Sequence, residues 1–232
     1  MSKTLIFSAT YNEKDNIKEL IYQINRFKEN LDILIIDDNS PDQTGEILVK
    51  LKSTYNNLIS IHRDQKLGLD TAHKFAYQYA IDNGYTKLIT MDADLSHDPK
   101  EIPVLINLLD KHEFVIGSRY MEGGKCEMQG LRLLMSIIGN KVIRLVLKLK
   151  CTEFTSSYRG FNIEKLQNFN LNIVQSKGYS FFMESIFRIT QNGYKIHQIP
   201  ITFRNRTKGV SKIPKIEILR TIKNLLILKF ID

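Results

Sequence analysis

Residues 87–98 read KLITMDADLSHD, an apolar run that ends in two aspartates one residue apart. Residues 32–42, DILIIDDNSPD, repeat that arrangement, with acidic side chains directly after a run of Ile and Leu. Short apolar runs of this kind are typical of buried strands, and segments with helical spacing separate them. Alternation of strand and helix predicts β-α-β units and a mostly parallel sheet. The expected fold is therefore α/β, with acidic residues at strand ends.

The same alternation extends over the first 120 residues. Strands are expected at residues 3–8, 32–36, 58–62, 87–91 and 114–118. Helices are expected between them, at residues 15–27, 42–55, 69–82 and 99–110. In open parallel sheets the ligand lies beyond the carboxyl ends of the strands. Both acidic clusters follow strands, so the pattern predicts a site at that edge.

The pattern changes after residue 120. Gly123, Gly124 and Gly130 indicate a loop, and a basic apolar segment follows at residues 131–150. The remaining elements are expected to be a strand at 158–163, a helix at 181–191, a strand at 195–203 and a helix at 215–230. No repeat or Pro/Ser-rich linker divides the chain. We therefore expect one domain over residues 1–212 and an amphipathic helix over 213–232 that packs on the domain or on a membrane.

Composition narrows the class of partner. The chain has 232 residues, of which 43% are hydrophobic and 25% charged, as is typical of a globular protein. Its 33 Lys and Arg against 25 Asp and Glu give a net charge of +8, which favours an anionic partner. A nucleic acid, an acidic membrane surface and a phosphorylated substrate all meet that requirement, and charge alone does not choose among them.

Two further features bear on the compartment. Cys126 and Cys151 have no metal-ligand spacing, as is typical of unpaired thiols in a reducing compartment. The N-terminal apolar stretch is too short for a signal peptide, and no window reaches the roughly 18 apolar residues of a membrane span. We expect a cytoplasmic protein, or one that sits on a membrane without crossing it.

Asp92 and Asp94 are candidate metal ligands. In a strand, residues i and i+2 point to the same face, so the two carboxylates could converge on one hard cation. Mg²⁺ and Mn²⁺ take oxygen ligands and commonly keep positions open for substrate phosphates. The alternative for an Asp-x-Asp pair is a turn or a solvated loop. A second acidic cluster at another strand end favours the metal.

Two other segments admit two interpretations each. DDNSPD could be a turn with Ser40 or Asp42 as helix cap, while Asp38 faces a ligand. Residues 9–13, ATYNE, follow the first strand, and a nucleobase could stack on Tyr11 there. A packed tyrosine beside a helix cap fits those residues equally well. The usual phosphate-binding motifs, GxxxxGK[ST] and GxGxxG, are absent.

Taken in order, TYNE, DDNSPD, DADLSHDP, GSRY and FRNRTKGVSK resemble the motifs of family-2 glycosyltransferases. Within that family the chain resembles the dolichol-phosphate, or polyprenol-phosphate, mannose synthase branch. The resemblance spans about residues 4–212. TYNE and DxD are shared across the family, whereas the SPD, DADLSH, GSRY and RxxGxSK elements together are more specific to the branch.

The resemblance implies a GT-A fold, a Rossmann-like αβα sandwich with a mostly parallel central sheet and C-terminal amphipathic helices. It also implies Mg²⁺ or Mn²⁺ bound by Asp92 and Asp94. Ser96 is a candidate third ligand at a position where the family often has Gln, and Glu153 stands where the family has Asp. The implied nucleotide-sugar positions are Ala9, Tyr11, Glu13, Ile36, Asp38, Asp92 and Ala93. The implied catalytic positions are Asp94, Arg119, Arg132, Arg206 and Lys212.

The basic residues suit a phosphate acceptor. A lipid phosphate has a second pKa of about 6 and is already anionic near neutral pH. It can attack the sugar without a dedicated base, but it must be held against a second anion, the donor diphosphate. Arg and Lys side chains supply that positioning. His97 follows the DAD motif and is either a base or a loop residue that shapes the site.

The leading hypothesis is an inverting transfer of mannose from GDP-mannose to dolichyl or undecaprenyl phosphate. One alternative is a family-2 enzyme that uses a UDP-sugar with a lipid or glycan acceptor. Another is a non-catalytic nucleotide-sugar or membrane-binding module. No zinc-finger, helix-turn-helix or RNP-type signature supports a nucleic-acid partner.

Residues 131–150 and 215–230 interleave basic and apolar side chains. Basic amphipathic helices suit an anionic membrane interface, and ordinary packing on the core is the alternative. The expected enzyme is peripheral on the cytoplasmic face of a membrane, or it is held there by a separate membrane-anchoring partner.

Overall fold

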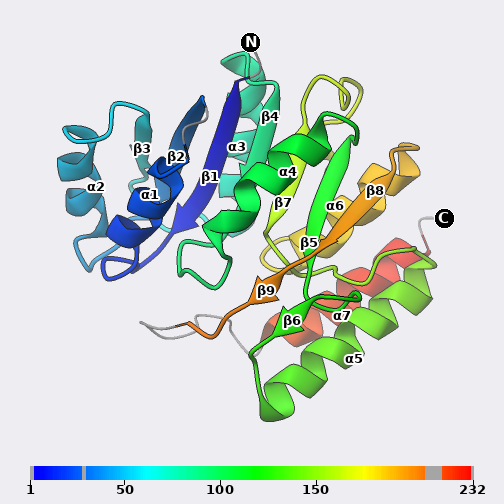
Figure 1. Ribbon diagram of the computed structural model, residues 1–232. Coiled ribbons are helices and arrows are strands. Elements are labelled where there is room, and N and C mark those ends of the chain that lie inside the picture. The colour runs from blue at the N-terminus through cyan, green and yellow to red at the C-terminus, as the bar shows by residue number, and fades with distance from the viewer. Residues whose placement is uncertain (1–2, 28–29, 207–215, 231–232) are drawn as a thin grey trace.

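The computed structural model describes residues 3–27, 30–206 and 216–230. Its centre is a seven-stranded sheet with the order β3-β2-β1-β4-β7-β5-β8 (Figure 1). The strands are β1 (Thr4–Thr10), β2 (Leu31–Asp37), β3 (Leu58–His62), β4 (Lys87–Thr90), β5 (Phe114–Ser118), β7 (Arg159–Asn162) and β8 (Ile196–Pro200).

All neighbouring strands in this sheet are parallel except β7. It runs antiparallel between β4 and β5, whereas β1 is parallel to both β2 and β4. Alternating side chains of β1 point to opposite faces of the sheet, so Leu5 and Phe7 enter one hydrophobic cluster and Ile6 enters the other. A sheet buried on both faces needs helices on both sides.

Helices cover each face of the sheet. α1 (Ile17–Asn25), α2 (Thr44–Lys52) and α4 (Ile102–Leu109) pack on the face of Ile6. α3 (Leu69–Asp82) and α6 (Ser180–Gln191) pack on the face of Phe7. The result is an αβα sandwich, as the sequence predicts.

Two more helices lie beside this sandwich. α5 (Gly130–Leu147) and α7 (Ile216–Lys229) contact each other, and α7 also contacts α6 (Figure 1). Near them the short strands β6 (Lys125–Cys126) and β9 (Thr202–Phe203) form a parallel pair of their own. Short 3-10 turns precede α4 (Pro99–Glu101) and α6 (Leu171–Ile173).

Most of the predicted elements are confirmed. The expected strands at 58–62 and 114–118 and the helix at 69–82 have the predicted bounds, and the others differ by a few residues at their ends. The single strand expected at 195–203 is wrong, because β8 and β9 belong to different sheets. Between them, the N–H of Ile201 donates to Ser118 O at 3.1 Å, and its carbonyl accepts from Lys125 N at 2.9 Å. The chain therefore pairs with β5 before Ile201 and with β6 after it. The strand β6 lies in a segment that was expected to be only a loop.

The structure also bears on membrane-spanning helices and on the two cysteines. Among the described residues, no helix is long and apolar enough to cross a membrane. Cys126 is half-buried and Cys151 is buried, and both are unpaired.

Gly160 in β7 provides a test of core packing. A Cβ there would lie 2.9 Å from Leu109 Cδ1 of α4, whereas a Cβ at Gly139 of α5 would meet nothing within 4 Å. We expect Gly160→Ala to lower the free energy of unfolding by about 1–3 kcal/mol through overpacking. Gly139→Ala, the matched control, should raise it by about 0.5 kcal/mol because a helical glycine is replaced. Urea unfolding measures both, and equal stability of the two variants would contradict this packing.

Candidate active site

Three strands end at the same edge of the sheet. β1 lies between β2 and β4 and is parallel to both, so Thr10, Asp37 and Thr90 end their strands on one side. The acidic clusters that follow β2 and β4 therefore flank the turn that follows β1. The sequence-based expectation of one shared edge agrees with this arrangement.

The turns after β1 and β2 are hydrogen-bonded to each other. The backbone N–H of Asn12 donates to Ser40 Oγ at 2.9 Å, and that of Glu13 donates to Thr44 Oγ1 at 3.0 Å. Asn12 has a φ of 59°, a left-handed conformation that asparagine tolerates better than most residues. The two turns thus form one connected surface at the sheet edge.

Asp37 stabilises that surface from beneath. Its carboxylate is fully buried and accepts from Ser40 N at 3.1 Å and from Thr10 Oγ1 at 3.0 Å. His62 Nδ1 lies 2.9 Å from the same carboxylate. A buried carboxylate requires partners of this kind, so Asp37 is a structural residue of the turn.

In the DDNSPD turn, Asp42 contacts the start of α2, and a ligand role for Asp38 stays a prediction. Asp42 accepts the N–H of Thr44, the first residue of α2, at 3.1 Å, although Gln43 and not Asp42 directly precedes the helix. Asp38 instead faces α3, where Oδ1 accepts from Arg63 Nη1 at 2.9 Å and Oδ2 from Gly68 N at 2.8 Å. Asp42 therefore contacts the start of helix α2, while Asp38 is oriented by other residues.

The remaining candidate nucleotide residues lie close to this edge. Ala9 and Ile36 are register partners on β1 and β2. Tyr11 is half-buried, and Lys66 Nζ lies 3.7 Å from its ring centroid, a cation-π contact. Ala93 is buried in the cluster beneath the sheet. Tyr11 therefore has a polarised aromatic face that already attracts a cationic group.

Arg206 connects the first and last of the sequence motifs. Its Nε and Nη2 lie 2.9 Å and 2.6 Å from Asp94 Oδ2, and its Nη1 lies 3.3 Å from Glu13 Oε1. Asp94 Oδ1 also accepts from Ser96 Oγ at 2.6 Å and Ser96 N at 3.0 Å. Burial opposes ionisation of Asp94, but the Ser96 hydroxyl and the Arg206 guanidinium hold its pKa below the usual value. The guanidinium thus bridges carboxylates that follow two different strands.

Asp92 is the more accessible of the two DxD carboxylates. Its side chain is 46% exposed, against 10% for Asp94. Asp92 Oδ1 accepts from Ser157 Oγ at 2.5 Å, and its Oδ2 lies 3.7 Å from His97 Nδ1. One oxygen is therefore held by the protein, and the carboxylate as a whole remains open to a ligand.

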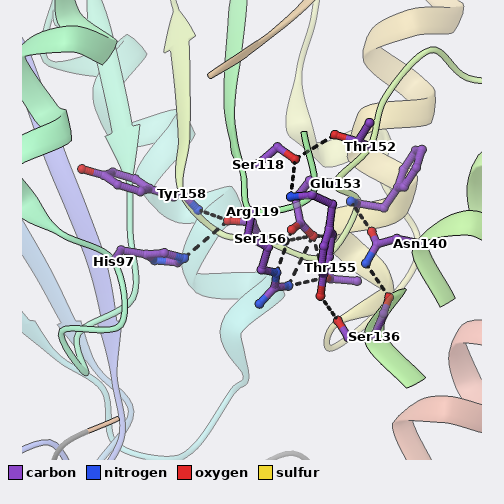
Figure 2. A network of polar contacts seen from close by, with 12 residues as sticks. His97, Ser118, Arg119, Ser136, Asn140, Thr152, Glu153, Thr155, Ser156 and Tyr158 are labelled. Carbon is purple, nitrogen blue, oxygen red and sulfur yellow. Dashed lines mark hydrogen bonds and ion pairs between the residues drawn. The ribbon is translucent and has the colours of Figure 1, made fainter. Parts of the chain in front are cut away.

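His97 is buried and structural. Its Nδ1 accepts the backbone N–H of Asp92 at 3.1 Å, and its Nε2 lies 3.4 Å from Ser156 Oγ (Figure 2). Burial lowers the pKa of His97, although the nearby Asp92 and Asp94 charges oppose that shift. With Nδ1 engaged as an acceptor, the ring supports the DxD loop, which favours the shaping role over that of a base.

Arg119 is paired with Glu153, as Figure 2 shows. Arg119 Nε lies 2.8 Å from Glu153 Oε2, and its Nη2 donates to Thr155 Oγ1 at 2.9 Å. Glu153 is fully buried, and its Oε1 also accepts the backbone N–H groups of Thr155 and Ser156. The Arg119 guanidinium further packs 4.5 Å from the Phe203 ring centroid. Glu153 therefore holds both Arg119 and the turn at residues 153–157.

A second buried arginine holds that turn from the core side. Arg159 Nε donates to Ser156 O at 2.7 Å, Nη1 to Ser185 Oγ at 2.6 Å and Nη2 to Phe182 O at 3.0 Å. Burial lowers the pKa of Arg159 to about 9, even though Cys151 and Glu153 favour its charge. Ser157, which donates to Asp92, belongs to the same turn. Arg159 therefore helps to position Asp92 through the backbone of this turn.

The same turn is tied to α5. Asn140 Oδ1 accepts the N–H of Phe154 at 2.7 Å, and Ser136 Oγ accepts from Tyr120 Oη at 2.6 Å (Figure 2). Asn140 is buried on the inner side of the helix. A shift of α5 would therefore also displace the residues beside Arg119.

The structure brings together some of the candidate residues and separates others. Asp94, Glu13 and Arg206 meet directly, whereas Arg119 is bound to Glu153 instead. Arg132 is exposed on α5 and has no ion pair within the described residues, and Lys212 lies outside the described residues. The hydroxyl of Ser96 points to Asp94.

Sequence reasoning assigned no role to three residues of this edge: Arg63, Glu153 and Ser157. Each contacts a candidate site residue, namely Asp38, Arg119 and Asp92. For Glu153 and Ser157 the only signal was that they stand where the family usually has other residues, and Arg63 had none because its partner Asp38 is distant in sequence.

Asp92 and Asp94 offer carboxylate oxygens of the type that Mg²⁺ or Mn²⁺ takes, but both oxygens of Asp94 already accept from Ser96 or Arg206. Across the described ranges, no group of three or more His, Cys, Asp or Glu side chains is suited to a metal. A protein-only cage of the zinc type is therefore not present in that part of the chain. Two carboxylates whose remaining positions are filled by substrate oxygens are typical of Mg²⁺ sites.

Comparison with known proteins shows the family of the chain. Residues 6–169 match the Glycosyl transferase family 2. The chain is 34% identical over 214 residues to the polyprenol monophosphomannose synthase of Mycolicibacterium smegmatis, which covers 91% of this chain and 81% of the relative. The undecaprenyl-phosphate mannosyltransferase of Micrococcus luteus is 32% identical over 212 residues, with 91% and 87% coverage.

Solved structures share the fold at low sequence identity. A mannosyltransferase from Pyrobaculum calidifontis, PcManGT, in complex with GDP-Man and Mn²⁺, has a TM-score of 0.60 at 15% identity. The match covers 99% of this chain and 63% of that chain. A mycobacterial protein has a TM-score of 0.66 at 16% identity, with 99% and 75% coverage.

The fold is of the α/β class, and polar side chains gather at one edge of its mostly parallel sheet. The chain belongs to glycosyltransferase family 2 and is similar to the polyprenol-phosphate mannose synthases. It is accordingly a glycosyltransferase.

The role of His97 can be tested by pH dependence. In His97→Asn, the side-chain oxygen can still accept the N–H of Asp92, so we expect turnover to fall less than tenfold and the shape of the pH–rate profile between pH 5.5 and 8.5 to stay unchanged. A general base would contribute roughly 10²–10⁴-fold. Loss of that size, together with loss of an ionisation from the profile, would show that His97 transfers a proton.

Proposed function

We propose that this enzyme transfers mannose from GDP-mannose to a polyprenyl phosphate, with inversion at the anomeric carbon. The observation that carries the proposal is the position of Arg206, which joins Asp94 of the DxD motif to Glu13 beyond β1. A guanidinium that bridges two acidic side chains at the edge of the sheet suits a transfer between two phosphates. Identity of 34% to a polyprenol monophosphomannose synthase supports the choice of substrates.

The nucleoside of the donor would occupy the surface formed by the turns after β1 and β2. Ala9 and Ile36 would contact it across the β1–β2 register, and Tyr11 would stack on the base after Lys66 leaves its ring. Asp38 would accept from ribose hydroxyls, with Arg63 and Gly68 N holding its orientation. A preorganised carboxylate of this kind gives specificity at little entropic cost.

Asp92 and Asp94 would hold Mg²⁺ or Mn²⁺ next to Ala93, with Ser96 orienting Asp94. When bound, the metal neutralises the negative charge that develops on the leaving diphosphate. In the solved neighbour PcManGT the bound ion is Mn²⁺. The exposed Asp92 carboxylate suits this task, because the ion must also contact the substrate.

The acceptor phosphate would be bound by Arg206 together with Arg119, Arg132 and Lys212. An oxygen of that phosphate forms a bond to the anomeric carbon while the bond from that carbon to the donor diphosphate breaks, and GDP leaves with the electron pair. The phosphate brings its own negative charge, so no protein base is needed. The Nδ1 atom of His97 already accepts the backbone N–H of Asp92, which is consistent with a reaction that uses none.

Transfer from a panel of radiolabelled GDP- and UDP-sugars to polyprenyl phosphate, with and without Mn²⁺ or Mg²⁺, tests the proposal. We expect a lipid product from GDP-mannose only when metal is present. Asp94→Asn should reduce this product at least 100-fold, because oxyanion and metal contacts of this kind contribute roughly 10²–10³-fold. A product from a UDP-sugar alone would overturn the donor, and no lipid product from any donor would overturn the acceptor.

The role of Arg206 can be separated from general charge effects. We expect Arg206→Ala to lower turnover at least 100-fold while the Kd for free GDP changes less than threefold. Arg204→Ala is the matched control, because Arg204 lies two residues before Arg206, is half-exposed and pairs with Asp98. Equal losses of turnover and GDP binding in Arg206→Ala would refute an acceptor role.

A further inference from the structure

The loop of residues 175–179 precedes α6 and is held through its backbone by three carboxylates from three helices. Asp70 of α3 accepts the N–H of Gly178 at 3.0 Å, and Glu217 of α7 accepts that of Tyr179 at 3.0 Å. The third carboxylate belongs to Glu184 of α6, whose Oε2 accepts from Gln175 N at 3.2 Å and from Ser176 N at 2.7 Å. All three carboxylates are buried, and a buried carboxylate requires partners of this kind. The loop is therefore fixed relative to α3, α6 and α7.

Gly178 permits this arrangement. Its φ of 62° lies in the left-handed region, and a Cβ there would lie 2.5 Å from Glu217 Oε2. A residue with a side chain would displace that carboxylate, and the N–H of Tyr179 would lose its acceptor. The backbone of Tyr179, directly before α6, is thus held in one place.

α3 connects the loop to the Asp38 cluster. Asp70 lies in the first turn of this helix, and Gly68, directly before the helix, donates its N–H to Asp38 at 2.8 Å. Three consecutive residues of the chain therefore bind both Asp38 and the N–H of Gly178.

α6 connects the loop to the DxD motif. The ring centroid of Phe182 lies 6.3 Å from that of Tyr179, and Phe182 O accepts from Arg159 Nη2 at 3.0 Å. Arg159 also holds the turn that carries Ser157, which donates to Asp92. Tyr179 is thus linked to the acidic clusters that follow both β2 and β4.

The charges of the candidate site act on the phenol of Tyr179. Burial raises the pKa of this phenol above its usual value, the carboxylates of Asp92 and Asp94 raise it further, and the Arg206 guanidinium opposes them. Coulomb interactions weaken with distance, so the phenol lies near these three groups. It remains a neutral hydroxyl among charged side chains.

This hydroxyl is open to a ligand. Tyr179 is half-buried, and within residues 3–27, 30–206 and 216–230 its hydroxyl makes no hydrogen bond. The charged groups beside it suit a metal and phosphates, whereas a neutral hydroxyl suits the uncharged part of the donor, which is the sugar. A phenol both donates and accepts, as sugar hydroxyls do. Other hydroxyls at this edge are already engaged with Asp92, Asp94 or Arg119, namely those of Ser157, Ser96 and Thr155.

We propose that the Tyr179 hydroxyl binds one hydroxyl group of the transferred hexose and so selects the sugar, and that Asp70 positions Tyr179 by holding Gly178. The inference rests on the proposed function because it requires a hexose donor. It does not depend on which nucleotide carries the hexose or on which acceptor receives it.

Donor analogues that each lack one of the sugar hydroxyls test this contact. The ratio of kcat/KM for GDP-mannose to that for each monodeoxy analogue is measured in the wild type and in Tyr179→Phe, with Mn²⁺ present. We expect the ratio for one analogue to fall roughly three- to tenfold in the variant, the factor that one neutral hydrogen bond supplies. Unchanged ratios for every analogue would overturn the contact.

A matched control and a second ligand exclude other roles. Tyr22→Phe removes an exposed hydroxyl from α1 and should leave every ratio unchanged. The Kd for GDP should change less than about threefold in Tyr179→Phe, because GDP lacks the sugar. A higher KM for polyprenyl phosphate with unchanged donor ratios would place the hydroxyl on the acceptor and overturn the proposal. If the wild type transfers another sugar, the proposed function is corrected, and the deoxy analogues of that sugar decide the inference.

The positioning role of Asp70 is tested by rescue. Asp70→Ala removes the acceptor of the Gly178 N–H and should lower the same ratio as much as Tyr179→Phe does. Asp70→Asn keeps an oxygen at that place and should stay within about threefold of the wild type. The losses should not multiply in Asp70→Ala/Tyr179→Phe, since residues that act through one contact are not additive. Multiplied losses would overturn the positioning role, and Tyr179→Phe, which leaves the buried contacts of Asp70 intact, decides the sugar contact even where Asp70→Ala is unstable.

Discussion

The parallel pairing of β1 with both β2 and β4 is the constraint on which the rest of the site depends. Parallel strands end at the same edge, so three segments distant in sequence deliver their polar turns to one place. Register partners such as Ile6 with Ile33 and Ile89 fix the depth at which each strand ends. A slip of one residue would send every apolar side chain of β1 to the opposite face, so burial on both faces enforces this alignment.

The contacts of the buried charged residues near the site are explained by the free-energy cost of burying a charge without partners. Glu153 is fully buried because Arg119, Thr155 and Ser156 satisfy its oxygens. Arg159 is also fully buried, but its partners are carbonyls and a hydroxyl, and its pKa falls accordingly. Removing one partner from such a set would leave an unpaired buried charge, so these contacts stabilise the turn between them. That turn positions Ser157 against Asp92.

α5 belongs to two environments. Its inner side supplies Asn140 and Ser136 to the residues around Arg119, and its outer side combines basic and apolar side chains. A helix with these two sides connects its outer surface to the edge of the sheet that carries the candidate site. Hydrogen bonds would couple the helix to the residues around Arg119, because buried polar groups have few alternative partners.

The sequence by itself determined the αβα fold, the order of elements and the strand-end positions of Asp38, Asp92 and Asp94, because apolar periodicity and strand–helix alternation are local properties. It also placed Tyr11, Glu13 and Arg206 among the candidates, through motif resemblance. Only the tertiary structure decided that Arg206 bridges Asp94 and Glu13, that Glu153 neutralises Arg119, and that β8 and β9 belong to different sheets. Those contacts join residues far apart in the chain, and their energies depend on burial and on which partners meet, which no local pattern encodes.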